Sequence, residues 1–598
     1  MSLTKVTYSM IQSAAADVSN FGTDATAVTA ALATLSSGGT LFFPKGTYTL
    51  ATEVAVTTSN IKILGEPGTI IQITGSNVHN AFQFAGVDNI VVSGITFYWA
   101  GADLTSATAD YNDLFALRFR STGTSSVPVT PCTNILVEGC TASQMLLIVS
   151  GWDAYPQASM TYALQNKWVV VSKNKVSCTL DSSAIYGGVA AIACFFTSYS
   201  KIVENSLSDK DADGNQVSTN SIGGIHFKGG NNGNWVYFNS TNNIVANNQL
   251  NIYGYGIYFA AARYNLVQGN VLNYLNSEAI DFEGCRDCLA DSNVMNQCKY
   301  ALAIFYYSAN ITFSNNTISI PNVTNGGAYG FNQSLSGSTD PTLQGNIYFI
   351  ANRFVGASID SGGADSLPII QFAMVNHLQF LGNYVEDCAV VFAGTVSFGE
   401  YRSNRFYWSQ NYTWGNGVTS QFGPGGPDNA TSTYANPTID ITDNEFYFYA
   451  PKSNNLATSS AIIVYNASTY MSTIRVERNH FTNFAYPITH QLVGSSDTNG
   501  QCTIKDNVCD INYAATTLTS FCATSGGPAN VKSLYFENNT TGLGVDIFGT
   551  TAGFTAQRIG AARGSILRNS APTASGVYAY INVATDGTTS WKSIALSA

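Results

Sequence analysis

The chain has 598 residues, of which only 11% are charged, 45% are hydrophobic and 12% are aromatic. This hydrophobic content supports a large core and excludes intrinsic disorder. The net charge is −11 at pH 7, and the sequence contains no basic stripe that could neutralise phosphates, so we expect no nucleic-acid partner. The polar surface must be built from Asn, Ser, Thr and Gly, which suits neutral, hydroxyl-rich partners.

The sequence also argues against a membrane span and a metal centre. Residues 1–8 lack the apolar segment of a secretory signal, and no apolar run approaches the ~20 residues of a membrane span, so we expect no membrane insertion. We interpret most of the 11 Cys as small core residues. The one C-x-x-C, from Cys285 to Cys288, lacks a second pair or a His at zinc spacing. We therefore predict neither a metal nor a cofactor.

The first predicted element is a helix over residues 24–36. Apolar residues recur in it at helical spacing, Thr23 is a candidate N-cap, and Gly38 and Gly39 end it. A strand pattern follows directly at residues 40–43. We assign residues 1–38 as a neck segment and capping helix, because an open stack of strands exposes edges that need cover.

A recurring phrase follows, in which alternating apolar residues precede Asn, one polar residue and an apolar residue. Consecutive Asn lie 22, 23 and 23 residues apart from Asn248 to Asn316, and 21 apart from Asn383 to Asn404. Longer gaps fit the same unit with a loop insertion. The phrase occurs at Asn174, Asn205, Asn248, Asn270, Asn293, Asn316, Asn352, Asn383, Asn404, Asn444, Asn479 and Asn507.

This period of about 22 residues with strand-like alternation predicts an all-β solenoid, a parallel β-helix over residues 39–548. Each coil of short strands cannot bury its own apolar face, so stacked coils share a continuous core. We expect the Asn to occupy a corner in the left-handed conformation that Asn tolerates, and to hydrogen-bond along the stack.

Carboxylates are scarce, and a cluster of them stands out at residues 278–283. With Ile280 and Phe282 in the core, Asp281 and Glu283 point outward from one strand, their Cα atoms about 6.5–7 Å apart. Glu278 precedes them and lies near the same face.

Aligning the neighbouring coils by their apolar residues brings further side chains to this face. Because rungs lie about 4.8 Å apart, these groups should lie within about 10 Å on one exposed surface. Arg263, just past its strand, adds a cation in this interpretation. The aligned outward residues are His226, Tyr258 and Asp281 in one column and Lys228, Ala260 and Glu283 in the next.

From about residue 549 the Asn phrase gives way to short strands separated by turn signals. We assign residues 549–598 as a small C-terminal β module that covers the last coil or contributes to oligomerisation.

Residues 4–11, residues 39–48 with the phrase Pro-Lys-Gly-Thr-Tyr, and residues 564–569 and 591–596 resemble bacteriophage tailspikes. Those proteins belong to the pectate-lyase-like, right-handed β-helix superfamily. The resemblance implies a right-handed β-helix in a homotrimeric virion tail spike that binds and depolymerises a bacterial surface polysaccharide, either capsule or O-antigen. It also implies attachment to the phage tail through a missing or very short N-terminal region.

Glycoside hydrolysis requires one protonated carboxyl and one ionised carboxylate. We predict Glu283 and Asp281 as this acid and base, with Glu278 as a substitute for either. Their spacing favours inversion weakly, because side-chain rotamers can absorb the difference. The alternative is that outward carboxylates on a solvated strand only keep the protein soluble.

A lyase mechanism uses the same residues differently. His226 or Lys228 abstracts the C5 proton of a uronic acid, Tyr258 donates to the leaving oxygen, and Arg263 neutralises the sugar carboxylate. A chain of net charge −11 does not attract such an acidic substrate at long range.

Loop tryptophans are further candidates for glycan binding, because indole faces stack on sugar rings. Trp235, Trp408 and Trp414 lie in polar, Gly-rich stretches, although packing against the coils would also explain them. Residues 209–215 match the start of a calcium loop but lack its final Glu, so we interpret them as an acidic turn. Glu400 has no identifiable acidic neighbour.

The sequence therefore predicts a polysaccharide depolymerase, most simply an endo-glycosidase. The alternatives are a polysaccharide lyase, a receptor-binding spike that adheres to glycan without cutting it, and a secreted pectinase of the same superfamily.

Overall fold

The computed structural model forms two compact units, residues 1–311 and 312–598, which are described separately. The residues that it describes are 15–74, 79–100, 115–124, 127–150, 165–178, 190–209, 223–229, 240–252, 254–321, 328–334, 345–356, 368–372, 375–392, 396–408, 420–423, 438–448, 460–467, 473–484, 486–493, 501–510, 522–525, 534–541, 566–568, 577–582 and 591–595.

Unit 1 begins with strand β1 (Ala15–Asp17), the 3-10 helix η1 (Val18–Asn20) and helix α2 (Ala25–Ala33). The predicted helix is present, but its N-cap is Asp24 and not Thr23. The Asp24 carboxylate accepts a hydrogen bond from the Ala27 N–H at 2.8 Å, which satisfies a free amide of the first turn. The first long strand starts at Gly39, where the sequence places the end of the neck segment.

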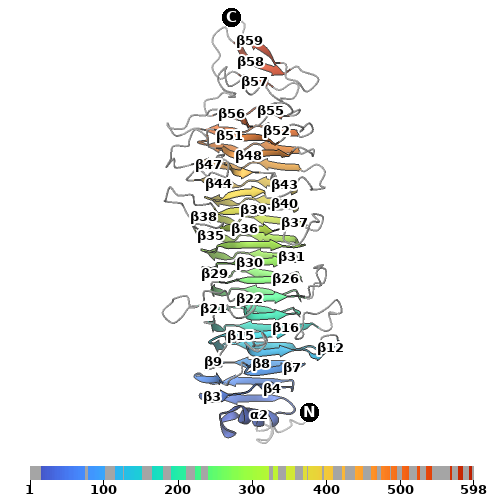
Figure 1. The fold of residues 1–598 in the computed structure, drawn as a ribbon, viewed down its shortest axis with the longest axis vertical. Coiled ribbons are helices and arrows are strands. Elements are labelled where there is room, and N and C mark those ends of the chain that lie inside the picture. Colours follow the sequence, from blue (N-terminus) through green and yellow to red (C-terminus); the bar gives the residue numbers. More distant parts are fainter. Residues whose placement is uncertain are drawn as a thin grey trace, which may run out of the picture. The chain divides into compact units, whose positions relative to one another are not determined.

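Unit 1 is a parallel β-helix with three parallel sheets (Figure 1). Sheet A contains β1, β2 (Gly39–Phe43), β5 (Ile61–Gly65), β8 (Asp88–Ser93), β13 (Thr133–Glu138), β16 (Asn166–Ser172), β19 (Thr197–Ser198), β20 (Lys201–Val203), β23 (Ser240–Thr241), β24 (Ile244–Ala246), β27 (Ala262–Arg263), β28 (Leu266–Gln268) and β31 (Arg286–Asp291). Sheet B contains β3 (Gly46–Leu50), β6 (Thr69–Ile73), β9 (Thr96–Trp99), β14 (Thr141–Ala142), β17 (Lys175–Ser177), β21 (Ser206–Ser208), β25 (Gln249–Asn251), β29 (Val271–Asn273) and β32 (Val294–Asn296). Sheet C contains β4 (Val54–Val56), β7 (Phe82–Ala85), β10 (Phe115–Arg120), β15 (Met145–Ser150), β18 (Ala190–Phe195), β22 (Gly223–Lys228), β26 (Ile257–Ala260), β30 (Glu278–Glu283) and β33 (Tyr300–Phe305). Strands β11 (Thr122–Thr124) and β12 (Val127–Thr130) form an antiparallel pair.

Unit 2 has the same arrangement, and β34 (Ala309–Ser314) contains the division between the units. Its sheet A contains β37 (Asn346–Ile350), β40 (Val375–Leu381), β43 (Val396–Arg402), β46 (Thr438–Thr442), β49 (Thr473–Glu477), β52 (Gln501–Lys505) and β55 (Leu534–Glu537). Its sheet B contains β35 (Thr317–Ile320), β38 (Arg353–Gly356), β41 (Tyr384–Glu386), β44 (Arg405–Trp408), β47 (Glu445–Phe448), β50 (His480–Thr482), β53 (Val508–Asp510) and β56 (Thr540–Thr541). Its sheet C contains β36 (Tyr329–Ser334), β39 (Ile369–Phe372), β42 (Ala389–Phe392), β45 (Ser420–Gly423), β48 (Ser460–Ala467), β51 (Tyr486–Val493) and β54 (Cys522–Ser525).

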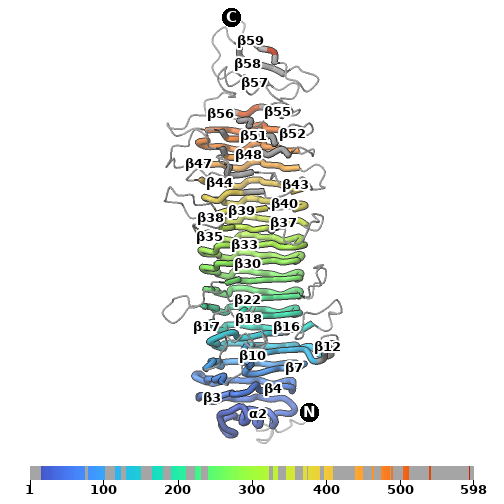
Figure 2. The backbone as a smooth tube through the Cα atoms, viewed as in Figure 1, coloured from blue at the N-terminus to red at the C-terminus, as the bar shows by residue number. Residues whose placement is uncertain are grey.

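The core lies inside the coils, where alternate residues of every strand point inward. Like residues stack from coil to coil, as the rings of Phe84 and Phe119 do at 4.2 Å and those of Phe227 and Phe259 at 5.1 Å. Figure 2 shows the coils of unit 1, in blue to green, following one another at an even spacing. This regular spacing fixes which residues of successive coils become neighbours.

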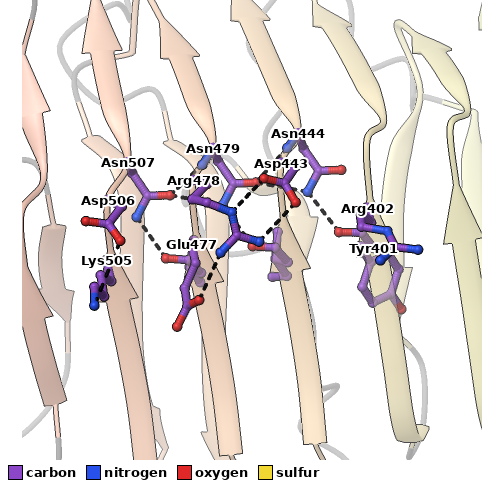
Figure 3. A network of polar contacts seen from close by, with 12 residues as sticks. Tyr401, Arg402, Asp443, Asn444, Glu477, Arg478, Asn479, Lys505, Asp506 and Asn507 are labelled. Carbon is purple, nitrogen blue, oxygen red and sulfur yellow. Dashed lines mark hydrogen bonds and ion pairs between the residues drawn. The ribbon is translucent and has the colours of Figure 1, made fainter.

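The predicted Asn ladder is present in both units. In unit 1 the Asn270 N–H and Nδ2 both donate to Asn293 Oδ1 at 3.0 Å, and Nδ2 also donates to the Val245 carbonyl at 2.9 Å. The same contacts recur along Asn174, Asn205, Asn248 and Asn270. In unit 2 they join Asn316, Asn352, Asn383, Asn404, Asn444, Asn479, Asn507 and Asn539, three of which Figure 3 shows on successive strands.

The expected left-handed conformation lies one residue earlier than predicted. Glu204, Gly269 and Ser292, which precede ladder Asn, have φ of 59°, 64° and 56°. The preceding residue makes the sharp bend, and the Asn itself stays free to align its amide with the next coil. In unit 2 one such bend residue, Arg478, also forms an ion pair with Asp443 at 2.8 Å (Figure 3).

The C-terminal strands β57 (Ile566–Arg568), β58 (Val577–Asn582) and β59 (Trp591–Ala595) form a three-stranded antiparallel sheet, unlike the parallel coils. The domain boundary at 549 and a role of this sheet in capping or trimerisation remain predictions.

Nine cysteines are buried, as expected for core residues, namely Cys132, Cys140, Cys178, Cys194, Cys285, Cys288, Cys298, Cys388 and Cys509. Among the described residues, no group of three or more His, Cys, Asp or Glu is placed to hold a metal. No helix in the described part of the chain is long and apolar enough to cross a membrane.

Substituting one ladder residue should destabilise unit 1 measurably. Asn270→Ala leaves the buried Val245 carbonyl and the Asn248 amide groups without their side-chain partner, so we expect a loss of about 2–4 kcal/mol in unfolding free energy. The matched change Gln268→Ala, at an exposed residue two positions earlier, should have little effect. Equal shifts of the thermal unfolding midpoint in the two variants would contradict a stabilising ladder.

Candidate functional site

The carboxylate cluster lies on strand β30 of sheet C, and the neighbouring strands align as the sequence predicts. His226 on β22 is opposite Tyr258 on β26, and Tyr258 is opposite Asp281 on β30. Lys228, Ala260 and Glu283 are opposite one another in the same way. Both predicted columns are therefore confirmed as neighbours in the sheet.

The expectation of an exposed face is wrong for Asp281 and His226 on this surface. Asp281 is only 1% exposed and His226 5% exposed, while Glu278, Tyr258 and Glu283 are partly buried. Ala303, next along the column from Asp281, is fully buried as well. Asp281, His226 and Ala303 are thus shielded from solvent, so Asp281 is not a solubilising charge.

Glu283 is held by two neighbours. The Tyr258 hydroxyl donates a hydrogen bond to Glu283 Oε2 at 2.6 Å. Burial raises the pKa of Glu283 above its usual value, while the hydrogen bond from Tyr258 and the charge of Lys228 oppose that rise. Burial together with the adjacent Glu283 and Asp281 raises the pKa of Tyr258 well above its usual value, so its hydroxyl keeps its proton.

Asp281 differs from Glu283 in having fewer stabilising contacts. Among the described residues, no group donates a hydrogen bond to its buried Oδ1 atom. Burial, followed by the charges of Glu283 and Glu278, raises the pKa of Asp281 well above its usual value. The two carboxyls therefore have different environments, and Asp281 is the one that favours the protonated form.

Aromatic rings border this pair. The ring of His226 lies 5.1 Å from that of Tyr258 and 6.4 Å from that of Tyr255. Burial and the charge of Glu278 raise the pKa of Tyr255. Sequence reasoning missed Tyr255, although the same offset of 23 residues that aligns Tyr258 with Asp281 also aligns Tyr255 with Glu278. The Ser277 hydroxyl donates to the Glu278 carboxylate.

Arg263 is not brought into this cluster. It lies on β27 in sheet A, where its Nε donates to Asp287 Oδ2 at 2.7 Å and its guanidinium lies 4.4 Å from the centre of the Tyr264 ring. The cation near Glu283 is Lys228 instead.

The prediction that Trp408 binds glycan is wrong. Trp408 is fully buried, its Nε1 donates to the Cys388 carbonyl at 3.0 Å, and its ring stacks on Phe406 at 5.7 Å. It belongs to the core of unit 2. Trp235 and Trp414 lie outside the described residues, as does the predicted acidic turn beyond Asp209.

Glu400 in unit 2 has an acidic neighbour that sequence reasoning missed. It pairs in register with Asp440, and an alignment on Asn404 and Asn444 would have shown this. Both carboxylates form ion pairs, with Arg402 at 3.3 Å and Arg475 at 3.6 Å. This neutralisation by arginine makes the pair a weaker catalytic candidate than Asp281 and Glu283.

No protein-family model and no curated protein matches the sequence. Similar solved structures include ORF18 of Geobacillus virus E2, with 13% identity, a TM-score of 0.32 and coverage of 66% of this chain and 63% of that one. The N-terminal fragment of bacteriophage Phi29 gene product 12 has 10% identity, a TM-score of 0.37 and coverage of 88% and 91%. A hyperthermoactive exopolygalacturonase from Thermotoga maritima has 11% identity, a TM-score of 0.30 and coverage of 83% and 91%. At these identities and TM-scores, the similarities identify no function for this chain.

Asp281→Asn should stabilise the protein at neutral pH. Because the folded pKa of Asp281 lies above its unfolded value, the folded state binds more protons between the two values, and stability falls as pH rises through that window. The uncharged amide removes the free-energy cost of keeping this acid protonated in the folded state, so we expect a gain of about 1 kcal/mol or more at neutral pH. Calorimetry at about pH 4 and about pH 7 should show the larger gain at the higher pH.

Asp287→Asn is the matched control with the opposite sign. Burial raises the pKa of Asp287, but hydrogen bonds from Asn310 and Arg263 outweigh it and lower that pKa overall. The ionised Asp287 carboxylate stabilises the folded state at pH values above the pKa that Asp287 has in the unfolded chain, and this contribution is lost as pH falls. Asp287→Asn should therefore be less stable than the wild type at neutral pH. If Asp281→Asn is less stable than the wild type at neutral pH, the inference that the environment of Asp281 disfavours the ionised carboxylate is wrong.

Proposed function

We propose that the chain is a bacteriophage tailspike enzyme that hydrolyses a bacterial surface polysaccharide, capsule or O-antigen, at Asp281 and Glu283. The observation that carries the proposal is the buried Asp281 carboxyl, which has no hydrogen-bond donor to Oδ1 among the described residues and lies beside the hydrogen-bonded Glu283. A buried acid in such an environment costs folding free energy, and groups with perturbed pKa values cluster at functional sites.

The different environments of the two carboxyls support a division of roles. Asp281, whose pKa is raised most, donates its proton to the glycosidic oxygen as the bond from that oxygen to the anomeric carbon breaks. Glu283, held by Tyr258 and Lys228, accepts a proton from the water whose oxygen bonds to the same carbon. The products are two shorter chains that together contain one added water.

Burial of Asp281 sets a requirement for this mechanism. Glu278 and Glu283 are already partly exposed, whereas Asp281 meets a substrate only after a local rearrangement around it. Glu278 is the substitute acid if that rearrangement places it nearer to the scissile bond.

Two contacts favour hydrolysis over the lyase alternative. A lyase would need the Tyr258 hydroxyl as proton donor, but this hydroxyl donates its hydrogen bond to Glu283. Arg263 forms an ion pair with Asp287 away from the cluster. A lyase would leave both groups free to meet a uronic acid.

The proposal includes a homotrimer in the virion, attached to the phage tail. Trimerisation is tested by light scattering of the intact protein, where a mass of one chain would overturn it and a mass of three chains would support it.

Substitution of either carboxyl should stop cleavage without stopping binding. We expect Asp281→Asn and Glu283→Gln each to lower the rate of oligosaccharide release by about 100-fold or more, because each removes a proton transfer. Mass spectrometry of products from purified capsule or O-antigen should show one added water per cut.

The control for this experiment is Glu445→Gln, which changes an exposed, ion-paired carboxylate of unit 2 and should leave the rate unchanged. Unsaturated products without added water would mean a lyase. A polymer that is bound but never cut would mean an adhesin.

Tyr258→Phe should change the pH dependence of cleavage. Loss of the hydrogen bond removes an interaction that lowers the pKa of Glu283, so that pKa rises. Because Glu283 must be ionised to act as the base, the acidic limb of the pH–rate profile should move to higher pH. A lower rate with an unmoved acidic limb would assign Tyr258 a structural role only.

A further inference from the structure

A column of left-handed residues runs along sheet A of unit 1, one residue in each coil. Strand registers and the hydrogen bond between Asn310 and Asp287 place its members opposite one another on successive coils. All have φ between 54° and 64°. The members are Asn60, Asn89, Asn134, Trp168, Tyr199, Asn242, Tyr264, Asp287 and Asn310.

Three members of this column are large aromatic residues in positions that suit Asn. Asn and Asp adopt the left-handed conformation readily, whereas for a bulky side chain it is an outlier that costs of order 1 kcal/mol or more. Trp168, Tyr199 and Tyr264 are also 49%, 40% and 50% exposed. Neither the backbone conformation nor burial in the core therefore accounts for their presence.

The three aromatic residues, called here the aromatic row, lie close together along the stack. Trp168 and Tyr199 are on adjacent coils, and Tyr264 follows after one intervening coil that carries Asn242. At about 4.8 Å per coil the row spans about 14 Å. Arg263 holds the last ring in place, because its guanidinium contacts Tyr264 and is itself paired with Asp287.

The row continues from the candidate catalytic site. Tyr264 lies four residues beyond Ala260, which pairs with Glu283, and Asp287 lies four residues beyond Glu283 itself. Four residues span at most about 14 Å of chain, so the row borders the edge where sheet C turns into sheet A.

We propose that Trp168, Tyr199 and Tyr264 bind the polysaccharide chain beside the site of cleavage. The inference rests on the proposed function and names further binding positions for the same polymer. A sugar ring presents a face of C–H groups that packs on the electron-rich face of an aromatic ring. The Asn242 amide between the rings can donate to and accept from hydroxyl groups, and a repeating polymer suits contacts that repeat with the coils.

The test replaces each aromatic residue by Asn, the residue found at most other positions of the column. Trp168→Asn, Tyr199→Asn and Tyr264→Asn are combined in an Asp281→Asn background, so that the polymer is not cut during measurement. The probe is a panel of purified, immobilised bacterial capsular polysaccharides and O-antigens. The single variant Asp281→Asn, with the aromatic row intact, is first used to find the polymer that the protein binds. We expect at least about tenfold weaker binding of that polymer by the combined variant.

The thermal unfolding midpoint separates a binding role from a structural one. Because Asn fits the left-handed conformation better, the combined variant should be at least as stable as its parent. Tyr98→Asn, at a 49% exposed tyrosine on β9 of sheet B, is the control and should leave binding unchanged.

Three outcomes would overturn the proposal: unchanged affinity, weaker binding accompanied by a lowered unfolding midpoint, or a loss of oligomeric mass in light scattering, which would make the row an interface between copies of the chain. Failure of Asp281→Asn to bind any polymer in the panel would overturn it as well. Cleavage that persists in Asp281→Asn would instead contradict the catalytic assignment, and the binding comparison would still decide the row.

Discussion

The hydrogen bonds from each ladder Asn to the next determine how the coils of each unit stack. Asn270, for example, donates its N–H and Nδ2 to the Asn of the next coil, and Nδ2 also donates to a carbonyl of the preceding coil, so a bend that would otherwise bury unpaired polar groups is satisfied. The ladder also fixes register, because each Asn meets its partner on the next coil however many residues a loop inserts between the two. Offsets as different as 22 and 43 residues thus produce the same alignment.

This register explains why the sequence predicted which residues meet but not how deeply they are buried. The columns that contain Asp281 and Glu283 follow from counting residues between apolar positions, which is a local property of each strand. Shielding of Asp281 depends on what lies over sheet C, and no pattern within strand β30 carries that information. The alternation of a strand separates inward from outward positions, but an outward position is exposed only if nothing covers it.

The wrong predictions for Trp408 and for the left-handed corner residue have physical causes, and the sequence pattern contains part of the contrary signal. Trp408 follows Phe406 by two residues on one strand, and this period of two places both on the inward face. The polar residues that follow Trp408 favoured a loop, but the alternation of inward and outward residues along Arg405–Trp408 was the stronger signal. The left-handed residue was assigned to Asn itself because Asn tolerates that conformation. The preceding residue takes it instead, since the Asn side chain has to face along the stack to reach the next coil.

Two features that weaken the fold occur close together in unit 1. Asp281 is buried, and its Oδ1 accepts no hydrogen bond within the described part of the chain. The aromatic row occupies left-handed positions that Asn fills elsewhere in the same column. Each raises the free energy of the folded state, and each could be removed by a substitution that leaves the coil geometry unchanged. Asp287 shows that a carboxylate in the next sheet, six residues after Asp281, can be fully paired. Structural requirements therefore do not account for the environment of Asp281, and a shared ligand along these coils would explain both features at once.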